Sequence, residues 1–226
     1  MDFPIYPQEY QPTSTKDTYK ILDGKYVQYS ESSDTITSVP DDTRGKYTLL
    51  HAGDDRYVGS SFDSVGYDNI ANGNQGVDNM RGNGDSRDYL RGGKDDDLVM
   101  GMNGGDDLLM GDLGDDTVLG CENGHNIMRG GKGDDNMKGG NQRDSLIGDP
   151  GKDIYTGGGG SDFFVLRADN EDGKKNLTPN ASECDIIADY SSLDRDYVVM
   201  PGVSSSSGYK LSESDGNTYI EIMDGT

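Results

Sequence analysis

The sequence has no tryptophan, only two cysteines and few residues that could build a large hydrophobic core. Hydrophobic residues make up 31% of the 226 positions, and no stretch approaches the roughly 18 apolar residues that a membrane-spanning helix needs. Cys121 and Cys184 are too few for a disulfide framework or a zinc site. The first residues, MDFPIYPQEYQ, lack the basic and then apolar run of a cleaved signal peptide. We therefore expect no membrane span and no N-terminal export signal.

Basic residues are also scarce. The chain has 20 lysines and arginines against 42 aspartates and glutamates, which gives a net charge of -22. Nucleic acids and anionic membranes bind basic surfaces, so neither is an expected partner. A chain so acidic and so poor in apolar residues either stays disordered or folds with bound cations.

What the sequence does contain is a repeat. Units such as GGKDDDLVM (92–100), GDLGDDTVL (111–119), GGKGDDNMK (130–138) and GGGGSDFFV (157–165) have nine residues, and ten-residue units lie among them. Each unit has an acidic residue, here called the anchor, followed two positions later by an apolar residue. From residue 68 onward the anchors recur every nine or ten residues at Asp68, Asp78, Asp88, Asp97, Asp107, Asp116, Asn126, Asp135, Asp144, Asp153 and Asp162.

The repeat has a simple physical interpretation. A three-residue strand with one apolar side chain buries too little to be stable alone, so its copies must stack. Glycine permits the turns between strands, and aspartate supplies the hard oxygen ligands that calcium prefers. Stacked carboxylates repel one another unless a divalent ion lies between the layers. The pattern therefore predicts a solenoid with cation sites in its turns.

These units resemble the G-G-x-G-x-D-x-U-x nonapeptide of the RTX (repeats-in-toxin) calcium-binding family. The resemblance covers residues 53–165 and implies an all-β fold, a right-handed parallel β-roll (β-solenoid) with two short strands per coil. It also implies several Ca²⁺ ions, at least four in our estimate, between turns two units apart. Turn carbonyls and anchor side chains would be the ligands.

Alternate units face opposite edges of such a roll. The first edge carries Asp78, Asp97, Asp116, Asp135 and Asp153, and we expect regular calcium sites from Asp97 onward. The second edge carries Asp68, Asp88, Asp107, Asn126, Asp144 and Asp162. Its units at 82, 101 and 120 have an extra residue, and Asn126 lacks a charge, so these turns either bind calcium with altered ligands or keep their shape without metal. The spacing becomes regular again at Asp144 and Asp162, in GGNQRD and GGGGSD, and we expect weaker or missing sites among the lengthened turns.

The resemblance also marks the glycines of the turns. Residues just before an anchor, such as Asp115 and Asp134, are either additional ligands or solvated acids. The full set of predicted metal-site residues is Asp78, Asp88, Gly92, Asp97, Asp107, Gly111, Gly114, Asp115, Asp116, Gly130, Gly133, Asp134, Asp135, Gly139, Asp144, Gly148, Gly151, Asp153, Gly157, Gly159 and Asp162.

The ends of the chain are less repetitive. We expect residues 1–52 to form an N-terminal β cap, residues 53–165 the roll, and residues 166–226 a C-terminal β cap. The last segment contains a predicted hairpin with Asp215-Gly216 at its turn and TYIEI as a strand.

Several strand residues that should point outward are apolar: Leu98, Met100, Leu108, Met110, Leu119, Ile127, Ile147 and Ile154. Such a cluster suggests a covered face. Either the chain's own ends or a second copy of the protein would cover it.

Nothing in the sequence indicates an enzyme. His51 and His125 are the only histidines, and neither lies in a catalytic motif. The expected function is that of a secreted, extracellular calcium-binding protein whose folding depends on Ca²⁺, exported by a type I route as the resemblance implies. The alternative is a module for surface adhesion or matrix interaction, with self-association or a cell-surface partner, that uses the apolar outer face.

Overall fold

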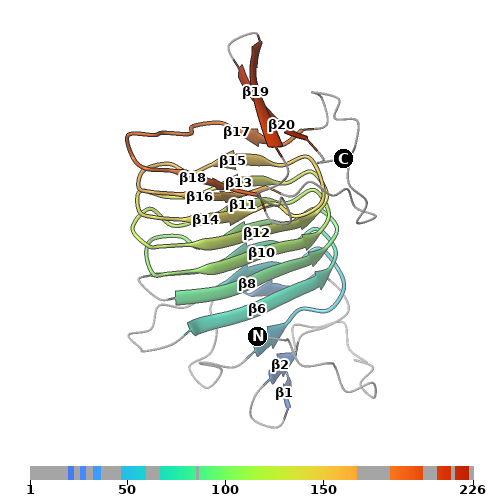
Figure 1. Cartoon of the computed structure of the whole chain (residues 1–226). Coiled ribbons are helices and arrows are strands. Elements are labelled where there is room, and N and C mark those ends of the chain that lie inside the picture. Colours follow the sequence, from blue (N-terminus) through green and yellow to red (C-terminus); the bar gives the residue numbers. More distant parts are fainter. Residues whose placement is uncertain are drawn as a thin grey trace.

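The computed structural model describes residues 20–22, 26–28, 33–36, 47–59, 67–84, 87–166, 184–200, 208–214 and 217–223. All named elements in these ranges are β-strands. Most of them belong to two sheets that lie face to face and stack coil upon coil along one axis (Figure 1). The strand colours run in sequence order from one end of this axis to the other.

The front sheet of Figure 1 has ten strands. In spatial order they are β1 (Lys20–Leu22), β2 (Tyr26–Gln28), β4 (Tyr47–Leu49), β6 (Tyr67–Gln75), β8 (Arg87–Lys94), β10 (Leu108–Leu113), β12 (Ile127–Lys132), β14 (Ser145–Ile147), β16 (Phe163–Val165) and β18 (Tyr197–Val199).

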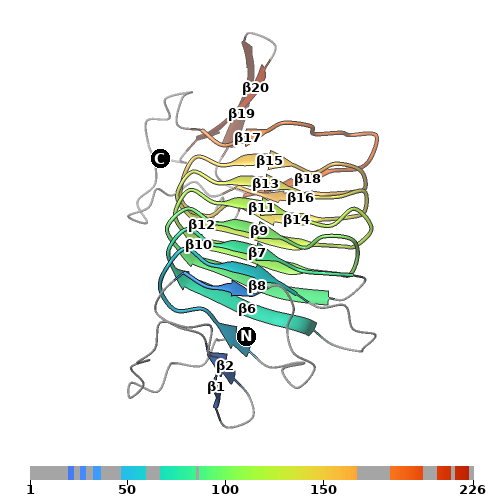
Figure 2. The same cartoon turned by 180° about the vertical axis from the view of Figure 1, so that it is seen from behind.

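The back sheet, which faces the viewer in Figure 2, has eight strands. They are β17 (Ile186–Ile187), β15 (Ile154–Thr156), β13 (Asn136–Lys138), β11 (Thr117–Leu119), β9 (Leu98–Met100), β7 (Asn79–Arg81), β5 (Arg56–Val58) and β3 (Thr35–Ile36). Apart from the antiparallel pair β1–β2, neighbours in both sheets are parallel. The predicted parallel β-roll is confirmed.

The interior is filled by one inward row of side chains from each sheet. In most strands of the roll one central residue points inward and is fully buried. The front sheet contributes Ala71, Leu90, Leu109, Met128, Leu146 and Phe164. The back sheet contributes Tyr57, Met80, Val99, Val118, Met137 and Tyr155. Stacking of identical positions therefore produces a continuous core from very few apolar residues.

The register differs from the sequence prediction at one place. Asn69, and not Asp68, pairs with Asp88 of the next coil, and Ala71 rather than Ile70 is the buried residue that pairs with Leu90. A register irregularity between Tyr67 and Asn69 shifts the strand by one position. The predicted anchor at Asp68 is therefore wrong. Leu109, two positions after the anchor Asp107, points inward as the repeat predicts.

The parallel pairing runs beyond residues 53 and 165 at the two ends. β2 and β3 already pair in parallel with β4 and β5, and β15 and β16 pair in parallel with β17 and β18. The predicted C-terminal hairpin is present as antiparallel β19 (Gly208–Ser214) and β20 (Asn217–Met223), and its turn, Asp215-Gly216, lies outside the described residues. That the two ends act as caps stays a prediction.

The apolar residues expected on the outer faces are there. Six of the eight are half-buried, while Ile127 and Ile154 are 49% and 37% exposed. What covers this face stays a prediction.

Candidate metal centre

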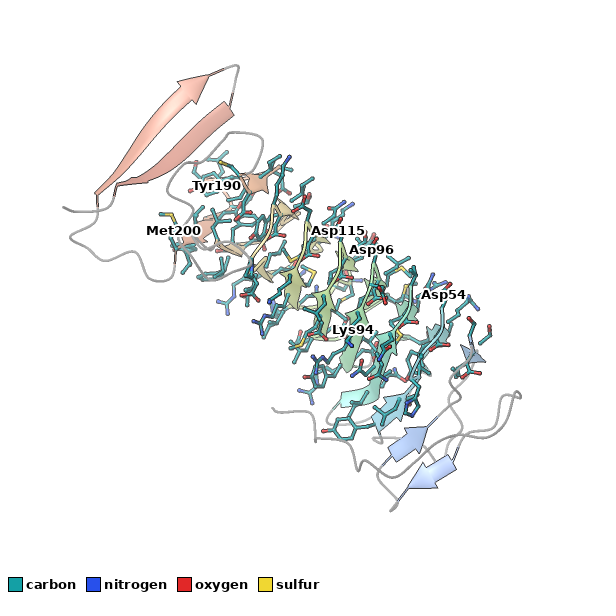
Figure 3. The ribbon with its side chains drawn as sticks, turned by 90° about the vertical axis from the view of Figure 1, so that its right-hand side faces the viewer. Asp54, Lys94, Asp96, Asp115, Tyr190 and Met200 are labelled. Atoms are coloured by element: carbon teal, nitrogen blue, oxygen red, sulfur yellow. The ribbon has the colours of Figure 1, made fainter. Side chains whose placement is uncertain are left out.

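The turns of the roll place the anchors in two columns, one on each edge. First-edge turns lead from a front strand to the next back strand, and second-edge turns lead from a back strand to the next front strand. Figure 3 views the roll from the side, and Asp54, Asp96 and Asp115, which immediately precede first-edge anchors, lie in one line along an edge. Equivalent turns are 18 or 19 residues apart in most of the roll.

Each anchor carboxylate binds the coil before it. On the first edge, Oδ1 of each anchor accepts a hydrogen bond of 2.6 to 3.0 Å from the backbone N–H of the preceding anchor. The column reads Asp34, Asp55, Asp78, Asp97, Asp116, Asp135, Asp153 and Asp185. Because only Oδ1 is used in this way, the second carboxylate oxygen remains for another partner.

That second oxygen is buried and has no donor at several anchors. The Oδ2 atoms of Asp55, Asp78, Asp97, Asp116 and Asp135 are inaccessible to solvent and accept no hydrogen bond within the described chain. A buried carboxylate oxygen without a partner is costly, because its desolvation is not compensated. A cation or a proton bound at Oδ2 would compensate this cost.

Burial also changes the acidity of these groups. Desolvation raises the pKa of Asp97 to about 9, that of Asp135 to about 8 and that of Asp116 to about 7, against an ordinary value of 3.8. The hydrogen bond at Oδ1 opposes this rise, and the negative charges of neighbouring aspartates add to it. A divalent ion between the layers would reverse both destabilising effects.

The first glycine of each unit makes room for Oδ2. A Cβ atom built on Gly92, Gly111, Gly130, Gly139, Gly148 or Gly157 would collide with the Oδ2 of the anchor in the same unit. At Gly139 it would also collide with the carbonyl oxygen of Gly157 in the next coil. On the first edge, a Cβ on Gly73 would likewise meet both Asp78 Oδ2 and the carbonyl oxygen of Gly92 in the next coil. Carboxylate and carbonyl oxygens, the donor types that calcium prefers, thus converge beside these two glycines.

Other turn glycines are required by backbone conformation. Gly114, Gly133 and Gly151 have φ values of 136°, 129° and 153°, which favour glycine. Asp95 occupies the equivalent position in the unit at 92 and still adopts a φ of 74°, so the turn keeps its shape without the glycine. Gly159 differs, because a Cβ there would make only ordinary contacts with Asn141.

The acids before the anchors form a separate, outer column. Oδ1 of Asp96 accepts the N–H of Asp115 at 2.9 Å, and Oδ1 of Asp115 accepts the N–H of Asp134 at 2.8 Å. All three side chains are exposed. Their carboxylates therefore bridge successive turns on the solvent side, and a role as calcium ligands stays a prediction.

The second edge is less uniform. Asp88, Asn126, Asp144 and Asp162 each donate a backbone N–H to Oδ1 of the following anchor, at 2.7 to 3.0 Å. The side-chain amide of Asn126 also donates to Oδ1 of Asp144 at 2.8 Å. Cys121, in the same turn, is buried, and burial raises the pKa of its thiol to about 11.

Sequence reasoning missed the anchors supplied by the C-terminal segment. Asp185 accepts the N–H of Asp153, and Asp196 accepts the N–H of Asp162, both at 3.0 Å. Both have the same spacing to an inward apolar residue, in DII (185–187) and DYV (196–198). These two motifs were visible in the sequence, but their aspartates lie 32 and 34 residues after the previous anchors on their edges instead of 18 or 19.

Side chains alone do not make a metal cluster. Within the described ranges, no three His, Cys, Asp or Glu side chains converge on one point. The anchors fit a calcium ion only together with turn carbonyls, as a stacked arrangement requires.

His125 is exposed, and its backbone N–H donates to Asp106 Oδ1 at 2.9 Å. The part of the chain that the structure describes contains no helix long and apolar enough to cross a membrane.

A parallel β-roll whose turns stack aspartates above glycines defines a class of repeat proteins that bind calcium. The family model of the RTX calcium-binding nonapeptide repeat matches residues 83–118 and 129–164, in four copies. The chain thus carries repeats of the RTX calcium-binding family, as the sequence resemblance predicts. Comparisons with curated proteins and with solved structures return no match.

Proposed function

We propose that this protein is a secreted calcium-binding roll whose folding and stability depend on Ca²⁺. The observation that carries the proposal is the column of buried Oδ2 atoms without donors on the first edge, from Asp55 to Asp135. The pKa of each of these carboxyls is raised by burial. A roll without cations must therefore either protonate these groups or bury them uncompensated.

The residues that would hold the ions are the first-edge anchors and the carbonyls of the turn glycines. Bound calcium would supply positive charge between carboxylates that otherwise repel one another. The chain itself shapes the site, because the Oδ1 hydrogen bonds orient each carboxylate and the glycines leave space beside Oδ2. The proposal includes no enzymatic activity.

If folding depends on calcium, the chain would fold outside the cell, where calcium is abundant, and not in the cytosol. Extracellular calcium-binding modules bind at roughly 10⁻⁴ to 10⁻³ M, far above cytosolic calcium. An ion that binds only the folded state adds to stability through mass action. The chain would therefore stay unfolded until export and fold outside, which fits the type I secretion that the RTX resemblance implies.

The test is a calorimetric titration of calcium-depleted protein with Ca²⁺, with circular dichroism recorded at each step. We expect cooperative uptake of several ions together with a change from coil to strand. Uptake without a change in the spectrum would contradict the folding switch while leaving calcium binding intact. No uptake at millimolar calcium would refute the proposal as a whole.

A second candidate is an adhesion or matrix-interaction module that uses the outer faces. Its support is a set of exposed apolar side chains near the C-terminal end of the roll: Ile154, Ile186, Tyr197 and Val199. Sedimentation of the calcium-loaded protein over a wide concentration range tests the self-associating form of this candidate. A monomer at all concentrations would count against it.

A further inference from the structure

We infer that the calcium sites lie along the first edge, between Asp55 and Asp135, and that the second edge is held together by the chain's own donors without metal. This inference rests on the proposed function, and it assigns the ions to particular layers. It divides the anchors into two kinds. An open anchor has a buried Oδ2 without a donor, and a closed anchor has its second oxygen or its whole side chain hydrogen-bonded within the chain.

The first edge contains an unbroken run of open anchors. Asp55, Asp78, Asp97, Asp116 and Asp135 are consecutive in the column, all are buried, and none has a partner at Oδ2. An ion between two coils needs oxygen ligands from both coils. Five consecutive open anchors provide four such intervals. The run begins earlier than the sequence prediction, which placed regular sites only from Asp97 onward.

The run stops at Asp153 because a tyrosine occupies the position beside its Oδ2. The hydroxyl group of Tyr155 donates to Asp153 Oδ2 at 3.5 Å and lies 3.3 Å from the carbonyl oxygen of Val165. A Cβ on Gly148 would meet both Asp153 Oδ2 and this hydroxyl. The phenol therefore fills the space that glycine leaves open in the earlier coils. Asp153 is a closed anchor.

On the second edge, an amide takes the place that a cation would occupy. Asn126 Nδ2 lies 3.2 Å from the carbonyl oxygen of Cys121, 3.1 Å from that of Gly124 and 2.8 Å from Asp144 Oδ1. Two turn carbonyls and the carboxylate of the next anchor thus converge on one nitrogen. These are oxygens of the types that calcium binds, and the two N–H groups of the neutral amide point into the space between them.

Three other anchors of the second edge have a donor at the second oxygen. Asp144 Oδ2 accepts the N–H of Gly140 at 2.6 Å, and Asp88 Oδ2 accepts the N–H of Asn83 at 3.1 Å. Asp196 Oδ2 accepts the N–H of Ser191 at 2.8 Å. At the start of the column, the amide of Asn69 donates to Asp88 Oδ1 at 2.6 Å. These anchors are closed.

Two open anchors remain on this edge, Asp107 and Asp162. Asp107 lies between Asp88 and Asn126, and Asp162 lies between Asp144 and Asp196. Each open anchor thus has closed neighbours on both sides. The second edge contains no interval between two open anchors within the described residues, so no interval there matches those of the first edge.

The family match leaves out the turn of Asn126. The residues between its two matched segments, 119–128, contain Asn126 and most of its turn, while the matched segments include the other second-edge anchors, Asp88, Asp107, Asp144 and Asp162. The gap is therefore specific to the turn in which the amide lies.

A matched set of carboxylate-to-amide substitutions tests this assignment. Asp116→Asn removes the shared anchor of two first-edge intervals, and Asp144→Asn makes the same chemical change on the second edge. We expect calorimetry to give four ions for the unmodified protein, two for Asp116→Asn and four for Asp144→Asn. Loss of ions from Asp144→Asn equal to that from Asp116→Asn would overturn the inference.

The reverse substitution, Asn126→Asp, tests the amide directly. It removes the three Nδ2 contacts and creates a carboxylate next to the open anchor Asp107. We expect a lower melting temperature at limiting calcium, recovery in millimolar calcium, and one additional ion. An unchanged melting temperature and ion count would contradict the role of Asn126.

A third measurement covers variants that fail to fold. A crystal structure of the unmodified, calcium-loaded protein shows directly which layers contain ions. Ions on both edges would refute this inference and leave the proposed function standing. Absence of calcium binding in the unmodified protein would refute the proposed function itself.

Discussion

The Oδ1 atom of Asp116 accepts a hydrogen bond of 2.8 Å from the backbone N–H of Asp97, which lies 19 residues earlier. The same contact recurs at each level of the first edge. One oxygen of each first-edge anchor is therefore a structural acceptor, and from Asp55 to Asp135 the other is buried without a donor. Because the two oxygens have different partners, substitution of an anchor and removal of calcium should have different effects on stability.

Replacement of Asp116 and Asp115 by alanine should have very different effects. Asp116→Ala leaves the buried N–H of Asp97 without its acceptor, at a cost of about 1–3 kcal/mol, and removes a proposed calcium ligand. Asp115→Ala removes an exposed acceptor of the Asp134 N–H, which should cost less than about 1 kcal/mol. Urea denaturation in calcium measures both. A loss of calcium affinity in Asp115→Ala comparable to that in Asp116→Ala would show that the outer acids are also ligands.

Two glycine substitutions test whether the space beside the anchor Oδ2 is needed. Gly111→Ala places a Cβ against Asp116 Oδ2 and should weaken calcium binding and destabilise the roll by about 1–3 kcal/mol. Gly159→Ala is the control, because its Cβ makes ordinary contacts and its φ lies outside the left-handed region. Calcium titration followed by circular dichroism compares the two. Equal effects would argue that the space beside Oδ2 is unimportant.

The calcium-free roll should be more stable in acid. Burial raises the pKa of Asp78 and Asp116 to about 7 and that of Asp97 to about 9, whereas unfolded aspartates ionise near 3.9. The folded state then binds more protons than the unfolded chain, so stability falls as pH rises from about 4 to about 9. We expect calcium-depleted protein to melt at a higher temperature at pH 5 than at pH 8.

Calcium should remove this pH dependence or reverse it, because the ion binds the ionised carboxylates and competes with protons. Thermal melts at both pH values, with and without calcium, provide the comparison. A calcium-depleted protein that is most stable at pH 8 would contradict the protonation of the anchors.

The thin core makes single inward residues important. Leu109 is fully buried in β10, and Leu109→Ala should destabilise the calcium-loaded roll by about 2–5 kcal/mol. Leu108, its neighbour on the outer face, is half-buried, so Leu108→Ala should cost distinctly less. Denaturant titrations of the two variants test which side of the strand faces the core.

Much of the fold follows from the spacing of anchors and apolar residues. Each strand needs one inward side chain, and the nine- and ten-residue units place Leu90, Leu109 and Met128 there. The spacing fails at β6 because an irregularity between Tyr67 and Asn69 shifts the register, and such a shift depends on contacts with the next coil. Asp185 and Asp196 were missed for a related reason, since the chain leaves the repeat before it returns to the roll.

The distinction between open and closed anchors was beyond sequence reasoning. It depends on which backbone N–H or side chain reaches the second carboxylate oxygen, as Gly140 does at Asp144. Only the loss of charge at Asn126 was visible in the sequence. Its three contacts become apparent once the turn of residues 120–126 is folded.

The hydrogen bonds of Asp196 determine how the stack terminates. Asp196 accepts the N–H of Asp162 from the coil below, but its own N–H turns back to the carbonyl oxygen of Ser191 at 3.1 Å. Every earlier aspartate of the first-edge column from Asp34 to Asp153 instead offers its N–H to the next layer. At Asp196 the second-edge column therefore has no donor left for a further layer. A further layer in this column would find the N–H of Asp196 already paired, so the ladder of aspartate contacts does not continue past this residue.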